Sequence, residues 1–302
     1  MAYPTIDRPY GFKPINLIGG QPYAGSTRMV PIAYGYSTNI FFGDFVAVQR
    51  GQAVRQAVTT AGSLFWNATI AASAGGALTI ASGGLNVVGV FMGCSFTDPT
   101  TKQKRFSQYW PASTLAGDAV AYIADDPDVC LRASVVTTQG GSTIGSVAPA
   151  MVGQNITASD LAGNVNTGDS YNGLFNTAFS SQAASSAWPL RIVEVVKDTA
   201  VVLGTATYSS GGASTTVVAS ANLTFAVPVG AQLSWIAPNG QLVDTGSYVT
   251  TAIAANNTAN IVISAIPLTS ITGTPTLVLT QYPEAIVKYN LGLHGYYTSL
   301  SV

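Results

Sequence analysis

Charge is the scarcest property of this sequence. Of its 302 residues, 12 are Lys or Arg and 13 are Asp or Glu, so charged residues make up 8%, against roughly 25% in an average soluble protein. The net charge of −1 supplies no basic excess to displace counterions from nucleic acid, which we therefore exclude as a partner. Repulsion between copies is equally weak, so we expect an uncharged polar surface that suits an assembly. The densest basic cluster, Lys102, Lys104 and Arg105, is interpreted as a solvated loop.

Residue types that carry catalysis are also nearly absent. The sequence has one histidine, His294, and two cysteines, Cys94 and Cys130, each cysteine within an apolar run typical of a strand. Nucleophilic catalysis needs a base beside the nucleophile, and zinc needs clustered His and Cys ligands; neither pattern occurs. We expect two buried free thiols, with a disulfide as the alternative. The protein is predicted not to be an enzyme, with no catalytic residue, no metal and no other cofactor.

Long apolar runs are missing as well. The first residues, MAYPTIDRPYGFKP, contain no hydrophobic core of a secretory signal, and Gly, Ser or Thr interrupts every apolar stretch before it reaches the length of a membrane span. We therefore expect a soluble chain made and folded in a cytoplasm, with no membrane partner.

What the sequence does contain is strand periodicity. Apolar residues alternate on both sides of Ala124–Asp128 within the stretch 117–134, and the Asp and Pro residues between them are typical of a turn. We predict a β-hairpin here. The three aspartates of this turn offer oxygen ligands for calcium, but their spacing favours a plain turn. Gly43-Asp44 precedes a similar strand-like run, as Gly117-Asp118 does.

Further strands follow from the same pattern. We expect strands at 28–34, 44–49 and 53–58, the last two as a hairpin, and others at 87–96 and 191–196. The polar, low-complexity stretch 137–186 is predicted to be a long loop, in which Ser159-Asp160-Leu161 is a candidate cap for a short helix.

A shift in composition marks residues 199–282, where Asp244 is the only charged residue. Short strands separated by turn residues are expected at 201–208, 215–219, 222–227, 231–236, 241–243, 247–252, 259–265 and 276–281. The flanking runs RIVEVV and EAIVKY resemble two paired strands, so we interpret 199–282 as a β-module inserted at the tip of a hairpin. Its test is geometric: Val195 and Ile286 should lie in neighbouring antiparallel strands.

The N-terminal 20 residues combine three prolines with aromatic side chains, which forbids a helix and favours an extended arm. Two alternatives remain open: the arm packs on its own domain, or it lies across a neighbouring subunit. The predicted fold is thus all-β, with an arm (1–20), a barrel- or sandwich-like body with long loops (21–198 and 283–302) and a small inserted β-sandwich module (199–282).

Several short motifs point to one family. PYGFKP followed by Gly19-Gly20, then GDAVAY, DPDVCLRA, PLRIVEVV and AIVKYNLGLHG, resemble segments of tailed-phage virion proteins from podovirus-like and cyanophage genomes. The resemblance covers about residues 9–198 and 283–302, whereas 199–282 departs from the pattern. It implies a capsid decoration, or cement, protein that trimerises on the outside of the head, with the major capsid protein and its own copies as partners.

A cement protein would act through the area that it covers, with a few aromatic anchors supplying the affinity. The candidate capsid contacts are Tyr3, Pro4, Pro9, Tyr10 and Phe12. We expect the protein on the capsid exterior of a virion assembled in the host cytoplasm.

Two other functions remain open. The first is a receptor- or glycan-binding virion protein that recognises a host glycan through 199–282, with Tyr208 and Tyr248 as candidates and Trp235 assigned to core packing. The second, ranked lower, is the major capsid protein itself, which would need a long helix that no stretch here predicts.

Overall fold

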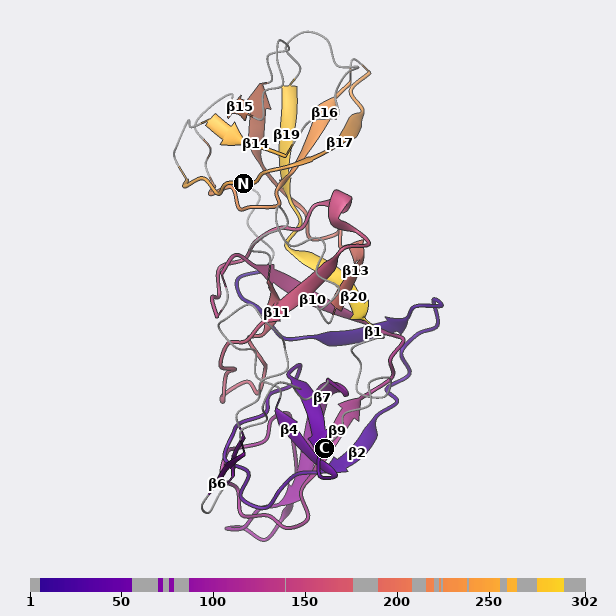
Figure 1. Ribbon diagram of the computed structural model, residues 1–302, viewed down its shortest axis with the longest axis vertical. Helices are drawn as coiled ribbons and strands as arrows, with labels where there is room; N and C mark the ends of the chain where they lie inside the picture. Colours follow the sequence, from indigo (N-terminus) through magenta and orange to yellow (C-terminus); the bar gives the residue numbers. More distant parts are fainter. Residues whose placement is uncertain are drawn as a thin grey trace.

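Strands make up almost all of the regular structure in the computed structural model, which confirms the all-β prediction (Figure 1). The only helix among the described residues is the three-residue 3-10 helix η1 (Pro149–Met151). The structure describes residues 6–55, 70–72, 76–78, 87–138, 140–175, 190–207, 216–219, 223, 225–237, 239–255, 260–264 and 276–290. Three sheets follow one another along the long axis of the molecule, and we call them lower, middle and upper as they lie in Figure 1.

The lower sheet has the strand order β2-β9-β7-β3-β4, with β8 paired to β7. Its strands are β2 (Arg28–Pro31), β3 (Phe45–Gln49), β4 (Gln52–Arg55), β7 (Gly89–Thr97), β8 (Lys104–Ser107) and β9 (Val120–Ala124). Ile32, just beyond β2, forms a parallel bridge with Ala53 of β4, so the two ends of the sheet meet. A separate two-stranded sheet joins β5 (Ile70–Ala72) and β6 (Gly76–Leu78).

The predicted hairpin near residue 50 is confirmed. Strands β3 and β4 pair antiparallel, with Gln49 opposite Gln52, and Arg50 and Gly51 form the turn with φ of 49° and 76°. Positive φ at both central residues is the geometry of a type I′ turn, whose twist matches that of the strands on either side.

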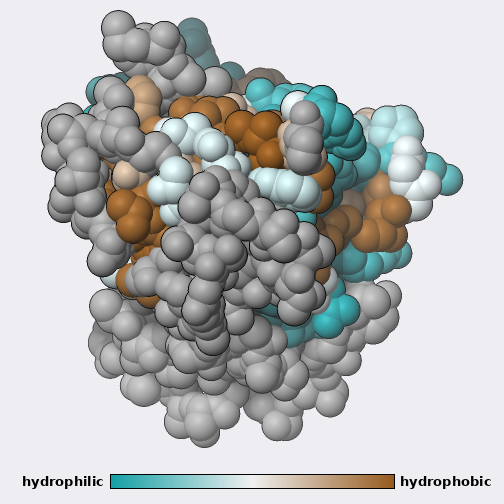
Figure 2. All heavy atoms as spheres, turned by 90° about the horizontal axis from the view of Figure 1, so that it is seen from above, coloured by the Kyte–Doolittle hydropathy of each residue, from teal (hydrophilic) through white to brown (hydrophobic). Residues whose placement is uncertain are grey.

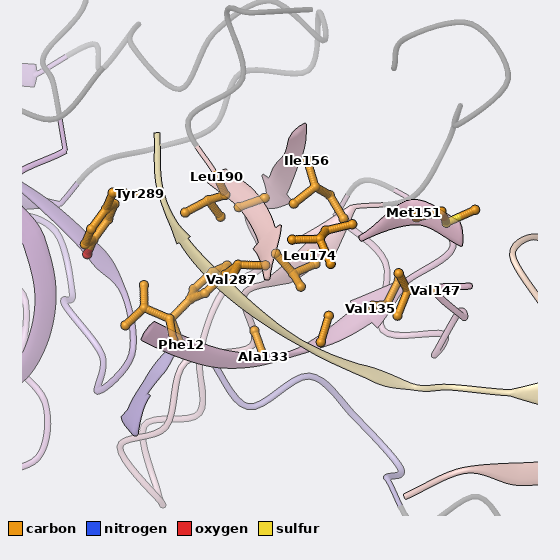
Figure 3. Close-up of a cluster of buried hydrophobic side chains, with 14 of the residues drawn as sticks. Phe12, Ala133, Val135, Val147, Met151, Ile156, Leu174, Leu190, Val287 and Tyr289 are labelled. Atoms are coloured by element: carbon orange, nitrogen blue, oxygen red, sulfur yellow. The ribbon is translucent and has the colours of Figure 1, made fainter. Parts of the chain in front are cut away.

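The middle sheet has the order β1-β10-β12-β11-β13-β20, and an additional pairing of β10 with β20 closes five of these strands into a ring. The strands are β1 (Lys13–Leu17), β10 (Val129–Val136), β11 (Asn155–Ser159), β12 (Gly173–Phe175), β13 (Leu190–Val195) and β20 (Glu284–Tyr289). Apolar side chains from β10, β11, β12, β13 and β20 converge on one core (Figure 3). That core also contains Phe45, Val87 and Val90, so it continues into the lower sheet.

The predicted hairpin over 117–134 is wrong, although both of its strands form. Strand β9 pairs with β2 and β7 in the lower sheet, whereas β10 pairs with β1 and β20 in the middle sheet. The turn chemistry was interpreted correctly, because the Asp126 carboxylate accepts the Asp128 N–H at 2.8 Å. This turn connects two sheets, since both edges of each strand are occupied by segments distant in sequence.

The long loop predicted over 137–186 is also partly wrong. Strands β11 and β12 lie within it, and Ser159 is the last residue of β11, not the cap of a helix. Strand β11 is rich in small or polar residues and β12 is only three residues long, so their sequence alone carries little strand signal. They form because β12 pairs parallel with β10 and antiparallel with β11.

The upper sheet has the order β17-β16-β19-β14-β15-β18, and all its pairings are antiparallel. Its strands are β14 (Val201–Thr207), β15 (Thr216–Ala219), β16 (Gln232–Ile236), β17 (Leu242–Tyr248), β18 (Asn260–Val262) and β19 (Thr276–Gln281). Just beyond β17 and β18, Val249 bridges to Ile263, which brings the two ends of this sheet together. Its core is separate from that of the middle sheet and contains only apolar residues.

The predicted pairing of the flanking strands is confirmed. Strands β13 and β20 are antiparallel, with Glu194 opposite Ile286 and Val195 opposite Ala285. The strand predicted at 222–227 is reduced, among its described residues, to a single bridge between Val227 and Ile253. Strand β17 is longer than the predicted 241–243 and takes in the start of the strand predicted at 247–252.

Candidate interaction surface

The described part of the N-terminal arm packs on its own chain. Phe12 is fully buried, and its ring centroid lies 4.2 Å from that of Phe45. Phe45 in turn lies 6.1 Å from Tyr289 of β20, so Phe12 joins the lower and middle sheets (Figure 3). The prediction that Phe12 is a surface anchor is therefore wrong, because this side chain has no exposed area to offer a partner.

The other arm candidates differ in their placement. Pro9 is buried, and the half-buried Tyr10 donates its hydroxyl hydrogen bond to Glu284. Burial, reinforced by this carboxylate, raises the pKa of Tyr10 far above its ordinary value. Tyr3 and Pro4 lie outside the described residues.

Glu284 is the centre of a first internal polar cluster. Its side chain is almost fully buried in β20 and accepts two hydrogen bonds from the Arg132 guanidinium, one of them at 3.0 Å, in addition to that from Tyr10. Burial alone would raise the pKa of Glu284, but the hydrogen bonds from Arg132 and Tyr10 outweigh it and lower the pKa below its ordinary value. The cluster connects the arm to β10 and β20.

Asp44 is the centre of a second cluster. Its carboxylate has no exposed area and accepts hydrogen bonds from Ser170 Oγ at 2.6 Å, Asn172 Nδ2 at 3.0 Å and the Phe41 N–H at 2.9 Å. Arg55 adds an ion pair with Asp44 at 2.9 Å.

Arg55 of this second cluster also pairs with Asp160, so the cluster connects the lower sheet to residues 160–172. In both clusters the carboxylates are saturated by partners from the same chain. They connect segments of the fold that are distant in sequence.

The two cysteines are free and buried, as expected. Burial raises the pKa of the Cys94 thiol to about 12, and it also raises that of Cys130. Cys94 donates its S–H to the Tyr109 carbonyl at 3.4 Å. Since the thiolate is the reactive form, neither cysteine has the environment of a nucleophile. His294 lies outside the described residues.

Two aspartates of the turn after β9 form ion pairs within the chain. In the predicted turn, Asp128 lies 2.9 Å from Lys288, and Asp125 lies 3.7 Å from Arg28. Among the described residues, no three His, Cys, Asp or Glu side chains gather as a metal site would require.

Two residues of the basic cluster are held in the same way, since Lys104 contacts Asp118 at 2.8 Å and Arg105 contacts Asp98 at 3.0 Å. Both lie in strand β8, so the interpretation of the cluster as a loop is wrong for these two residues.

The surface of the protein carries many large hydrophobic side chains. Within the described ranges, twelve large hydrophobic side chains are exposed: Ile18, Met29, Tyr34, Phe106, Leu115, Val152, Val165, Val202, Val218, Ile236, Leu242 and Val243. In the lower part of the molecule, Tyr34 and Leu115 lie close together, because the Gly35 N–H donates to the Thr114 carbonyl at 3.1 Å. Figure 2 shows hydrophobic residues also on the face at the upper sheet.

The glycan-binding candidates receive no support from this geometry. Tyr248 is half buried and packs against the core of the middle sheet, where burial raises its pKa. Tyr208 lies outside the described residues. Trp235 packs against the core of the upper sheet, as predicted from its alternation with Leu233.

Comparisons with protein-family models, with curated proteins and with solved structures returned no match. In the described part of the chain, no helix has the length and apolar character needed to cross a membrane. Sequence reasoning missed the exposed apolar residues and the two carboxylate clusters. The one sequence feature that could have pointed to the carboxylate clusters is the low content of charged residues. In a chain with so few charges, each charged residue is a candidate for a specific structural role.

Proposed function

We propose that this chain is a non-enzymatic structural protein of a phage particle. It binds the outer surface of the capsid, contacts the major capsid protein and cements neighbouring capsomers as a homotrimer. The observation that supports the proposal most is the division of residue types between interior and surface. Buried carboxylates are saturated within the chain, while large apolar side chains such as Met29, Tyr34 and Leu115 remain exposed on a nearly uncharged protein.

Such a surface would bind a partner through the apolar area that the contact removes from water. An apolar residue removed from water contributes roughly 25 cal/mol per Å² of buried surface, and repeated contacts around a symmetric shell add avidity. Three exposed apolar side chains of the lower part of the molecule, Met29, Tyr34 and Leu115, replace Phe12 as the source of the contacts, because Phe12 is occupied in the core. The arm remains a candidate only at Tyr3 and Pro4.

The test uses capsids that lack this protein, to which purified chain is added back. We expect full binding by the native chain, and a loss of occupancy when Met29, Tyr34 and Leu115 are replaced together by Ser. Removing residues 1–5 tests Tyr3 and Pro4 while leaving Phe12 in place. Unfolding temperature is the control for both variants. Native protein that leaves capsids bare at saturating concentration would refute the proposal.

A further inference from the structure

Two Asn-Gly pairs occur in this sequence, Asn172-Gly173 and Asn239-Gly240. An asparagine that precedes glycine is especially prone to deamidation, because glycine has no Cβ to hinder attack by its nitrogen on the asparagine side chain. The structure places the two pairs in opposite environments, so we expect a different fate for each.

The side chain of Asn172 is held at both ends. It is 2% exposed, its Nδ2 donates to Asp44 Oδ1 at 3.0 Å, and its Oδ1 accepts the Leu161 N–H at 2.9 Å. Gly173 is the first residue of β12 and lies opposite Ser159 of β11. The amide of Asn172 therefore cannot turn toward the Gly173 nitrogen without breaking the buried network around Asp44.

Asn239 lies in the turn that joins β16 and β17 in the upper sheet (Figure 1). Both Asn239 and Gly240 are exposed. The Ala237 N–H donates to the Gln241 carbonyl at 2.9 Å, and the Gly240 N–H donates back to the Ala237 carbonyl at 2.8 Å. Gly240 has φ of 81°, a conformation that favours glycine, so the turn itself requires the residue type that hinders attack least.

One hydrogen bond of this turn prepares the asparagine for attack. The Asn239 Oδ1 accepts the Gln241 N–H at 3.0 Å, which folds the side-chain amide back toward the Gly240 peptide. When a nucleophile adds to Cγ, negative charge develops on Oδ1, and a donor already in place stabilises that charge. The Gly240 N–H must first leave the Ala237 carbonyl. That opening is local, because residues 239–241 are exposed and lie outside the core of the upper sheet.

We propose that Asn239 is a deamidation site of this protein and that Asn172 is protected by the fold. The Gly240 nitrogen bonds to Cγ of Asn239, the bond between Cγ and Nδ2 breaks, and the side-chain nitrogen leaves as ammonia with the Gly240 amide proton. Water then opens the resulting succinimide and gives aspartate or isoaspartate at position 239. The net reaction converts an amide and water into a carboxylic acid and ammonia, without oxidation or reduction.

Deamidation changes the charge of the least charged part of the chain. Asp244 is the only charged residue between 199 and 282, so a carboxylate at position 239 doubles the negative charge there and takes the net charge of the chain from −1 to −2. The turn lies between Ile236 and Leu242, which are 38% and 56% exposed and pair opposite one another. The new carboxylate therefore stands beside an exposed apolar pair, and the surface of this hairpin changes as the protein ages.

The first test follows both asparagines in one sample. The purified full chain is incubated in mildly alkaline buffer, and peptide mass spectrometry measures conversion of amide to acid at Asn239 and Asn172 over time. We expect Asn172 to convert at least about tenfold more slowly, because it reacts only when its buried network opens. In denaturant the two rates should become similar, since glycine follows both residues. Equal rates in the folded chain, or conversion of Asn239 only in denaturant, would overturn the proposal.

The second test measures the charge of the folded protein. Isoelectric focusing of the aged native chain should show a more acidic form, and Asn239→Gln should remove most of it, because the longer side chain closes a ring less readily. Asn166→Gln is the matched control, since Asn166 is also exposed in a turn but is followed by Thr167; it should keep the acidic form. An undiminished acidic form in Asn239→Gln would contradict the assigned site. Capsids are absent from both tests, so their outcome is independent of whether the protein binds a capsid.

Discussion

The upper sheet and the two sheets below it are stabilised in different ways. The lower and middle sheets combine apolar cores with ion pairs, of which Arg55–Asp44 and Arg132–Glu284 have a buried carboxylate. The upper sheet has an apolar core and a single charged residue, Asp244, at its exposed edge. The difference shows that buried charge in this chain connects parts distant in sequence, whereas antiparallel neighbours in the upper sheet need only packing and backbone hydrogen bonds.

The largest effect is expected from opening the core between the lower and middle sheets. Phe12→Ala should lower the free energy of unfolding by about 3–5 kcal/mol, because a fully buried ring leaves a cavity. Hydrogen exchange should show the loss in β1, β3 and β20 but not in β14 to β19. Leu233 of the upper sheet is also fully buried, and Leu233→Ala should reduce protection in β14 to β19 but not in β1, β3 and β20. Loss of protection in all sheets from either variant would mean that the sheets unfold as one unit.

A somewhat smaller effect is expected from breaking a buried ion pair. Asp44→Asn removes the fully buried one of the two carboxylates that pair with Arg55 and should cost about 3 kcal/mol, measured by denaturant unfolding. Asp118→Asn is the control, since Asp118 also follows a glycine and lies just before a strand but is exposed. Its change should be far smaller. Equal effects would show that the buried network around Asp44 adds nothing beyond a surface contact.

The pH dependence of stability should also differ between the middle and the upper sheet. The folded-state pKa of Glu284 is lowered from 4.5, so its stabilising contribution is present above that value and is lost as pH falls through the lower folded-state value. Acid should therefore loosen the middle sheet before the upper sheet, as followed by hydrogen exchange. Glu284→Gln should be less stable at neutral pH and should remove this part of the acid response. An unchanged acid response in that variant would assign the effect to other carboxyls.

The smallest effects are expected at two turns. Gly51 in the β3–β4 turn and Gly240 in the β16–β17 turn have φ of 76° and 81°, where an added Cβ meets no neighbour but the backbone is strained. Each Gly→Ala substitution should cost about 1 kcal/mol, confined to its own sheet. Gly117→Ala is the control, because its added Cβ is also free of contacts and its φ is ordinary. A similar loss in the control would argue against turn strain as the cause.

Local sequence patterns predicted many of the strands and turns. They failed to predict which strands pair with one another. The turn at Arg50-Gly51 and the pairing of Val195 with the strand of Ile286 follow from short-range signals and were correct. The turn after Ala124 has equally good local chemistry, yet β9 and β10 separate because other segments occupy their edges.

The site residues show the same limit. Gly43-Asp44 and Gly117-Asp118 are alike in sequence, but one aspartate is buried among distant donors and the other is exposed. Phe12 was assigned to the surface because proline and aromatic residues mark an arm, and the sequence holds no sign of the core beside Phe45 that receives it. The burial of Asp44 and of Phe12 depends on tertiary packing, which a local sequence pattern does not contain.

The register of β13 against β20 has a consequence for how this architecture can diversify. The chain leaves β13 and re-enters β20 side by side, and the Val196 N–H donates to the Glu284 carbonyl at 3.1 Å. A few residues joining Val196 to Tyr282 would therefore span the gap without disturbing either strand. A different segment could therefore be inserted between β13 and β20 and give the protein a new surface. The pairing of the two strands would remain the same.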